Sequence, residues 1–231
     1  MPAEPRLFTL APRTPARAVA VVLHGGRATS DATVPPWSLA ALRLLPFAKA
    51  LHTAGRDHGL VVARLRYRVR GWNGAAADPV ADVTWALRHL DGGHPGLPAA
   101  LVGHSMGGRA ALGAAGQPRV QSIAALAPWI TETETVEQLR GRRLLIAHGD
   151  RDRTTDPRLS RKYAERARAV TDVCRFEVHG DGHAMLWRAA AWHDLVCRFV
   201  LGTLDLEPLD QTITNAMQSP DGLDVPLPRR P

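Results

Sequence analysis

The sequence contains few cysteines and no long apolar segment. Its 231 residues include only Cys174 and Cys197, which do not form a C-x-x-C pair. We therefore expect two reduced core thiols rather than a disulfide. No stretch approaches the ~18 apolar residues of a membrane span, and the first residues lack an apolar run of signal-peptide length. These absences predict a cytoplasmic protein with no membrane partner.

Several motifs for cofactors and metals are also missing. The glycines around Ser105 lack the G-K-[ST] ending of a phosphate-binding loop and the G-x-G-x-x-G pattern of a dinucleotide site. Ten histidines are present, but no H-E-x-x-H occurs, and the His-Gly pairs at 24, 148 and 179 close separate strand-like runs. We therefore expect neither a cofactor nor a catalytic metal.

The charge balance is basic, with 29 Lys and Arg against 22 Asp and Glu and a formal net charge of +7. Such an excess can indicate a nucleic acid or another polyanion as partner. The arginines are scattered, however, and their densest group, RLRYRVRGW at 64–72, belongs to no nucleic-acid-binding motif. We expect no nucleic-acid partner, and attribute the arginine excess to a general bias of composition.

Short apolar runs that resemble strands alternate with segments of helical periodicity. This alternation predicts one α/β domain, with a mainly parallel sheet flanked by helices, over residues 1–205. A helix is expected over 35–55, with a kink or break at Pro46. The proline-rich residues 206–231 have little periodicity and predict an extended or disordered tail. The strand-like runs are 18–26, 59–67, 99–105, 122–129, 143–150 and 173–180.

The segment LVGHSMGGRAALGAAG places Ser105 between an apolar run and an alanine-rich helical pattern. A strand that turns directly into a helix strains the turn residue, and Gly103 and Gly107 leave room for the close approach. The N–H of Met106, at the helix N-terminus, would then face an oxyanion. The alternative is a Gly-Ser turn that only packs the helix on the sheet. The pattern resembles the nucleophile elbow, G-x-S-x-G, of the α/β-hydrolase family, which includes small lidless esterases and dienelactone hydrolases.

A serine nucleophile needs a base to remove its proton and an acid to orient that base. In this family the order is serine, acid, histidine. His183 in HGDGHAM is the candidate base, whereas His179 ends a strand-like run and is expected to be structural. Asp150, Asp152 and Asp156 are the candidate acids, although the first suits a turn and the last a helix cap. The resemblance favours Asp152, because the family often carries H-G-x-x-D and HGDRD matches it.

The resemblance also implies a second oxyanion-hole N–H in the loop after an early strand. The segment VVLHGGR supplies Gly26, which we pair with Met106, and leaves Arg27 as a further candidate. The alternative is that Gly25 and Gly26 only form the turn, which is compatible with a role of Gly26 in the oxyanion hole.

Three tryptophans lie on loops that follow strand-like runs. Trp72 and Trp129 are our candidates for substrate binding, and Trp187 lies on a similar loop, while core packing is the alternative for each. The residues 129–142 are too few for the lid domain that many relatives insert there. We therefore expect an open site.

The resemblance implies a serine hydrolase that cleaves a small-molecule acyl substrate through an acyl-enzyme. A carboxylesterase is the first expectation. A thioesterase, or an amidase or peptidase of the same fold, is the alternative, because the fold does not fix the leaving group. A non-catalytic binding protein on the same scaffold is the competing class, and a polyanion-binding module is a third.

Overall fold

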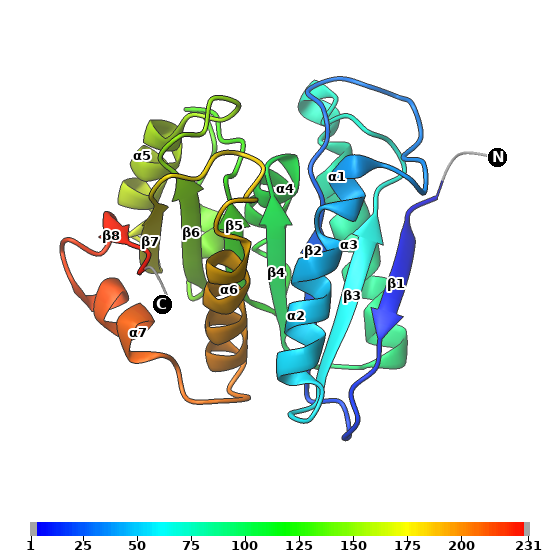
Figure 1. The fold of residues 1–231 in the computed structure, drawn as a ribbon. Coiled ribbons are helices and arrows are strands. Elements are labelled where there is room, and N and C mark those ends of the chain that lie inside the picture. The colour runs from blue at the N-terminus through cyan, green and yellow to red at the C-terminus, as the bar shows by residue number, and fades with distance from the viewer. Residues whose placement is uncertain (1–3, 229–231) are drawn as a thin grey trace.

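The computed structural model describes residues 4–228, which form one mainly parallel β-sheet covered by helices on both faces (Figure 1). The eight strands follow the order β1-β3-β2-β4-β5-β6-β7-β8. β1 pairs with β3 in antiparallel fashion, and every other neighbouring pair is parallel. The strands are β1 (Arg6–Leu10), β2 (Ala18–Leu23), β3 (Leu60–Arg66), β4 (Ala99–His104), β5 (Val120–Leu126), β6 (Arg143–Gly149), β7 (Asp172–Val178) and β8 (Val225–Pro226). The six strand-like runs correspond to β2 through β7, and the predicted fold class is confirmed.

The helices divide between the two faces of the sheet. α2 and α6 pack against each other on the face nearer the viewer in Figure 1, and α3, α4 and α5 lie behind it. The α-helices are α1 (Leu39–Leu42), α2 (Leu45–Gly55), α3 (Asp78–Gly93), α4 (Met106–Gly113), α5 (Pro157–Ala167), α6 (Ala189–Thr203) and α7 (Gln211–Gln218), and two short 3-10 helices are η1 (Gly74–Ala76) and η2 (Glu137–Leu139). The predicted break falls where expected, since α2 begins one residue before Pro46 and ends at Gly55.

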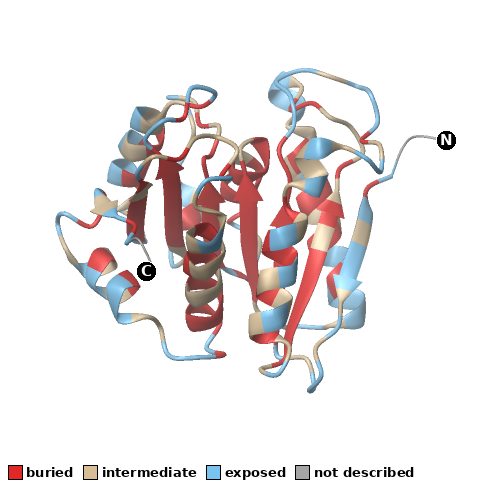
Figure 2. Ribbon diagram, in the orientation of Figure 1, coloured by how far each residue is buried: buried red, intermediate tan, exposed pale blue. Residues whose placement is uncertain are grey.

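The central strands are buried on both faces (Figure 2). In β2, Val19 and Val21 belong to the hydrophobic core beneath α3 and α4, whereas Ala20 and Val22 belong to the core beneath α2 and α6. Successive side chains of a strand point to opposite faces, so one continuous apolar run supplies both cores. This explains why these strands appear in the sequence as unbroken apolar runs.

The C-terminal segment differs from the extended or disordered tail expected over 206–231. Helix α7 is capped by Asp210, whose carboxylate accepts hydrogen bonds from the N–H groups of Thr212 and Ile213 at 2.9 and 3.2 Å. The short strand β8 then pairs with β7. Ile213 and Leu227 are buried in the core on the α6 side, and this burial orders the segment. Residues 229–231 of the predicted tail lie outside the described residues.

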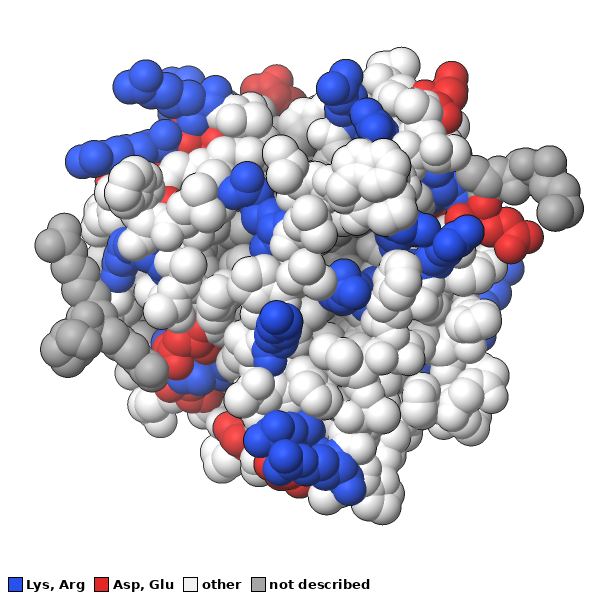
Figure 3. Space-filling view, turned by 45° about the vertical axis from the view of Figure 1, so that its right-hand side comes forward, with Lys and Arg blue, Asp and Glu red and all other residues white. Residues whose placement is uncertain are grey.

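The two cysteines are free thiols, with Cys174 buried in β7 and Cys197 partly buried in α6. No helix between residues 4 and 228 is long and apolar enough to cross a membrane. Lys and Arg side chains are scattered over the face drawn in Figure 3 rather than gathered in one patch.

Parallel strands bring distant loops to one edge of the sheet. β2, β4, β6 and β7 run in the same direction, so the loops after their carboxyl ends emerge together. Those loops carry Gly26, Ser105, Asp152 and His183.

Candidate active site

Ser105 occupies the turn between β4 and α4. Its backbone angles are φ 55° and ψ −119°, which a residue with a side chain rarely adopts and which cost on the order of 1–3 kcal/mol. The neighbouring glycines permit this turn, because a Cβ on Gly103 would lie 2.2 Å from the oxygen of Gly107. A Cβ on Gly107 would in turn lie 2.3 Å from the oxygen of Leu23. The turn leaves Ser105 partly exposed between the buried side chains of His104 and Met106.

The loop after β2 lies directly against this turn. A Cβ on Gly25 would lie 3.3 Å from the Cβ of Ser105, and one on Gly26 would lie 2.4 Å from Cε of Met106. Within residues 4–228, the backbone hydrogen bonds of the turns and loops use neither the N–H of Gly26 nor that of Met106. The N–H of Arg27 instead donates to the oxygen of Arg70 at 2.8 Å. Gly26 and Met106 therefore keep donors available beside Ser105, and Arg27 does not.

His24 holds the start of the β2 loop. Its Nδ1–H donates to the oxygen of Gly25 at 2.6 Å, and its Nε2 accepts from the N–H of Tyr67 at 3.4 Å. Burial lowers the pKa of His24 to about 4, so the ring is neutral at pH 7. The sequence gives His24 no role beyond its His-Gly pair, because its contact with Tyr67 joins residues 43 positions apart.

His183 and Asp152 come together although 31 residues separate them. Nδ1 of His183 lies 2.8 Å from Oδ2 of Asp152. A carboxylate can only accept, so Nδ1 carries the proton and Nε2 is left with a free lone pair. The His183 side chain is 20% exposed and that of Asp152 is fully buried.

His183 is close to the serine turn without being bonded to the serine. Its ring centroid lies 4.7 Å from that of His104, the residue before Ser105. Within the described residues, no hydrogen bond joins the Ser105 hydroxyl to His183. Such contacts commonly tighten when substrate binds.

The Asp152 carboxylate is surrounded by hydrogen-bond donors. Oδ1 accepts from the N–H groups of Thr154 and Thr155 at 2.7 and 3.0 Å. Oδ2 accepts from Nε2 of His148 at 3.2 Å and from the hydroxyl of Thr155 at 2.8 Å, in addition to His183. Burial alone would raise the pKa of Asp152, but these hydrogen bonds outweigh it and hold the pKa well below the usual range. Asp152 is therefore ionised at neutral pH.

The two alternative acids lie elsewhere. Asp150 contacts Nδ1 of His179 at 3.2 Å and the N–H of Gly180 at 2.7 Å, near the surface. Asp156 caps helix α5 by accepting from the N–H of Arg158 at 2.9 Å. Of the three candidates, Asp152 is the one that contacts His183.

Two buried side chains that sequence reasoning missed hold the His183 loop. Nε2–H of His104 donates to the backbone oxygen of His183 at 2.9 Å. Burial lowers the pKa of His104 to about 3, which keeps this ring neutral. Asp181 accepts from Nε1–H of Trp192 at 2.9 Å and from the N–H of Gly182 at 2.8 Å. The sequence signal for His104 was its place beside Ser105, but its partner became visible only in the fold.

Trp72 and Trp129 lie close together near the serine turn, with ring centroids 6.3 Å apart. The guanidinium carbon of Arg109 lies 4.0 Å from the Trp72 centroid and 4.6 Å from that of Trp129. Arg109 is held in turn by an ion pair with Glu134. Trp72 is only 7% exposed and packs in the core, which is the alternative that the sequence left open for it.

A cavity of about 350 Å³ adjoins the β2 loop. Gly25, Gly26 and Val34 line it, together with the exposed side chains of Trp37 and Leu39. This volume suits a modest-sized organic group. Trp187, 86% exposed, lies on the loop that follows His183. The segment between β5 and β6 contains only a short loop and η2, without an inserted lid domain.

Ser105, His183 and Asp152 thus lie on neighbouring loops, with the free N–H groups of Gly26 and Met106 beside Ser105. No group of three His, Cys, Asp or Glu side chains within residues 4–228 is placed to hold a metal ion.

Comparison with known proteins identifies the family of the chain. Residues 8–229 match the model of the alpha/beta hydrolase family. None of the curated proteins matches the chain. Similar solved structures include a protein of unknown function from Agrobacterium tumefaciens, with a TM-score of 0.69 and 15% identity over 89% of this chain and 94% of that one.

Two further structures resemble the chain in fold. One is a monoacylglycerol lipase from Paleococcus ferrophilus, with a TM-score of 0.62 and 15% identity over 87% of this chain and 100% of that one. The other is a serine hydrolase without a lid from Xanthomonas campestris, with a TM-score of 0.60 and 17% identity over 87% of this chain and 88% of that one. The resemblance first seen in G-x-S-x-G is confirmed, and the chain belongs to the alpha/beta hydrolase family.

Proposed function

We propose that the protein is a serine hydrolase that cleaves carboxylic esters through a covalent acyl-enzyme. The observation that carries the proposal is the 2.8 Å contact between Nδ1 of His183 and Oδ2 of Asp152, on the loops beside the strained Ser105 turn. Asp152 fixes the tautomer that leaves Nε2 of His183 able to accept a proton. The family membership and the lipase and lidless serine hydrolase among the similar folds support a hydrolase.

The first half of the reaction acylates the enzyme. His183 takes the proton of Ser105 as its oxygen attacks the ester carbonyl, and the carbonyl oxygen becomes an oxyanion held by the N–H groups of Gly26 and Met106. Each well-placed donor lowers the barrier by on the order of 3 kcal/mol. The C–O bond then breaks, and His183 returns the proton to the leaving alcohol.

The second half releases the acid. Water gives a proton to His183 and attacks the acyl carbon. As the second oxyanion collapses, the bond between the acyl carbon and Oγ of Ser105 breaks, His183 returns the proton to Oγ, and the carboxylic acid leaves. Asp152 stays ionised throughout, because its five hydrogen bonds stabilise the carboxylate.

The size of the cavity beside Gly26 supports a modest-sized substrate, and its lining offers both apolar side chains and two arginines, Arg27 and Arg70. We propose Trp37 and Leu39, which line that cavity, as further substrate contacts, and keep Trp129, whose N–H donates to the oxygen of Ser105 at 3.1 Å, as a candidate. The two free thiols support a cytoplasmic location.

The test is labelling by a fluorophosphonate, followed by intact mass and by turnover of p-nitrophenyl acetate. Wild type should gain one adduct, while Ser105→Ala and His183→Ala should gain none and lose turnover. His179→Ala is the matched control, since this histidine is paired with Asp150 near the surface and should leave labelling unchanged. A folded wild type that neither labels nor turns over would favour a binding protein on the same scaffold.

A further inference from the structure

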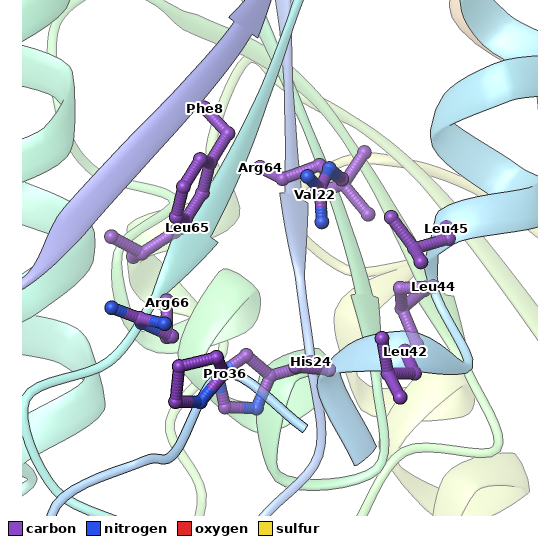
Figure 4. Close-up of a pocket in the computed structure, with 11 residues that line it drawn as sticks. Phe8, Val22, His24, Pro36, Leu42, Leu44, Leu45, Arg64, Leu65 and Arg66 are labelled. Carbon is purple, nitrogen blue, oxygen red and sulfur yellow. The ribbon is translucent and has the colours of Figure 1, made fainter. Parts of the chain in front are cut away.

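A second cavity, of about 260 Å³, lies on the α2 side of the sheet near its β1 edge (Figure 4). We call it the arginine cavity. It shares His24 with the cavity beside Gly26, but its other walls come from different residues. Figure 4 shows two facing walls, the first from β1 and β3 and the second from α1 and the start of α2. The walls consist of Phe8, Arg64 and Arg66 on one side and Leu42, Leu44 and Leu45 on the other.

The first wall carries two positive charges. Arg64 and Arg66 are two residues apart on β3, so their side chains leave the same face of the strand. Their guanidinium carbons lie 5.2 and 5.5 Å from the centroid of the Phe8 ring. Both arginines are partly buried, and burial lowers the pKa of Arg64. Figure 4 shows the two guanidinium groups turned to different sides of the Phe8 ring, with Arg64 pointing toward Val22 and the leucines.

Neither charge has a counter-ion among the described residues. Within residues 4–228, no carboxylate forms an ion pair with Arg64 or Arg66. By contrast, Arg68, Arg109 and Arg175 each pair with Asp or Glu. The first wall therefore presents two guanidinium groups that pair with no carboxylate of the described residues.

The rest of the cavity is apolar or neutral. Leu44 is buried and Leu45 is partly exposed, and both present aliphatic surface to the arginines. His24 adds no charge, because burial lowers its pKa to about 4 and both ring nitrogens are already bonded. A small inorganic anion would leave the leucines without contact, and a neutral lipid would leave both arginines unpaired. The lining matches a ligand with one anionic end and a short apolar body.

We propose that the arginine cavity binds a short aliphatic carboxylate, whose head pairs with Arg64 and Arg66 and whose chain lies against Leu42, Leu44 and Leu45. A planar carboxylate fits the guanidinium fork better than a spherical anion does. Binding there requires no reaction at the serine turn.

The direct test is calorimetric titration of the full chain with octanoate at low ionic strength. We expect saturable binding to one site. Octanol keeps the chain but lacks the charge, and acetate keeps the charge but lacks the chain, so each should bind at least about tenfold more weakly. Octanol bound as tightly as octanoate would overturn the proposal, and so would the absence of saturable octanoate binding.

Variants assign the binding to this cavity. The double variant Arg64→Gln/Arg66→Gln should weaken octanoate binding at least about tenfold. Arg88→Gln changes an exposed arginine of α3 and should leave it unchanged. Ala41→Trp fills the cavity from α1 while keeping both charges, and should also abolish binding. Thermal unfolding checks that each variant is folded. Unchanged binding in the folded double variant, or in the folded Ala41→Trp variant if the double variant does not fold, would overturn the proposal.

Discussion

His148 and His183 contact the same oxygen of Asp152. Nε2 of His148 lies 3.2 Å from Oδ2, and Nδ1 of His183 lies 2.8 Å from it. His148 is fully buried and its Nδ1 is bonded to the hydroxyl of Ser160 at 2.9 Å. Burial lowers the pKa of His148, so the ring is neutral and Nε2–H donates to the carboxylate. We therefore expect His148 to act as a positioning residue for Asp152, the proposed acid.

Replacing His148 tests this role. The variant His148→Phe removes one buried hydrogen-bond donor from the carboxylate of Asp152. The carboxylate then interacts more strongly with His183. We expect kcat/KM for p-nitrophenyl acetate to fall about tenfold, with the acid limb of its pH profile moved to higher pH. His148→Gln keeps an N–H donor and should restore most of the activity and the profile. A profile identical in wild type and His148→Phe would contradict the positioning role.

Replacing each of the three candidate aspartates by asparagine tests which of them is the acid. Asp152→Asn should lower kcat by about four orders of magnitude, because the amide favours the wrong tautomer of His183. Asp150→Asn should change kcat by less than a few-fold. Asp156→Asn should leave kcat unchanged and cost at most about 1 kcal/mol of stability at the α5 cap. Stopped turnover in Asp150→Asn or Asp156→Asn, with the fold intact, would show that the acid is misassigned.

Two buried neutral histidines predict that the protein loses stability in mild acid. The pKa of His24 falls from 6.5 to about 4 on folding, and that of His104 falls from 6.5 to about 3. Below pH 6.5 these two histidines therefore bind protons in the unfolded chain but not yet in the folded chain. The free energy of unfolding decreases as pH falls. Between pH 6 and pH 4 each histidine contributes up to about 1.4 kcal/mol per pH unit.

Urea unfolding at a series of pH values measures this slope. His104→Gln keeps a donor for the His183 backbone oxygen and removes the titration, so its stability should depend less on pH than that of wild type. His89→Gln alters an exposed histidine of α3 and serves as control. Equal slopes for wild type and His104→Gln would mean that His104 titrates normally in the folded state.

Local sequence patterns predicted the elements whose formation depends on residues that are close together in the chain. The strands β2 through β7 and the break before Pro46 follow from apolar runs and from the missing proline N–H. The strand β1 escaped notice because it lies at the sheet edge, where Phe8 is 41% exposed and polar residues interrupt the run. Its pairing with β3 involves residues more than fifty positions apart.

The same limit applies to the candidate site. Order and strand context selected Ser105, His183 and three candidate aspartates, and the family resemblance favoured Asp152 among them. The roles of His104 and His148 depend on neighbours that only the folded chain supplies. The arginine cavity likewise needs β1, β3 and α1 together, so RLRYRVRGW alone gave no sign of it.

The segment after residue 205 provides the last prediction, since its prolines suggested a tail while its side chains complete the core. Arg175 of β7 is 3% exposed, and its guanidinium donates to the oxygen of Leu223 at 3.0 Å. Deleting 206–231 would remove this partner from a buried charge and uncover apolar surface on the α6 side. We expect the deleted protein to unfold at a much lower temperature or to fail to fold.

A point variant makes the same test without truncation. Ile213→Ala, at a fully buried position of α7, should lower the free energy of unfolding by about 2–5 kcal/mol. Gln218→Ala, at an exposed position of the same helix, should change it by less than about 0.5 kcal/mol. Urea unfolding measures both. If Ile213→Ala behaves like Gln218→Ala and the deletion keeps the wild-type melting temperature, residues 206–231 contribute nothing to the core, and the domain ends where the sequence alone placed it.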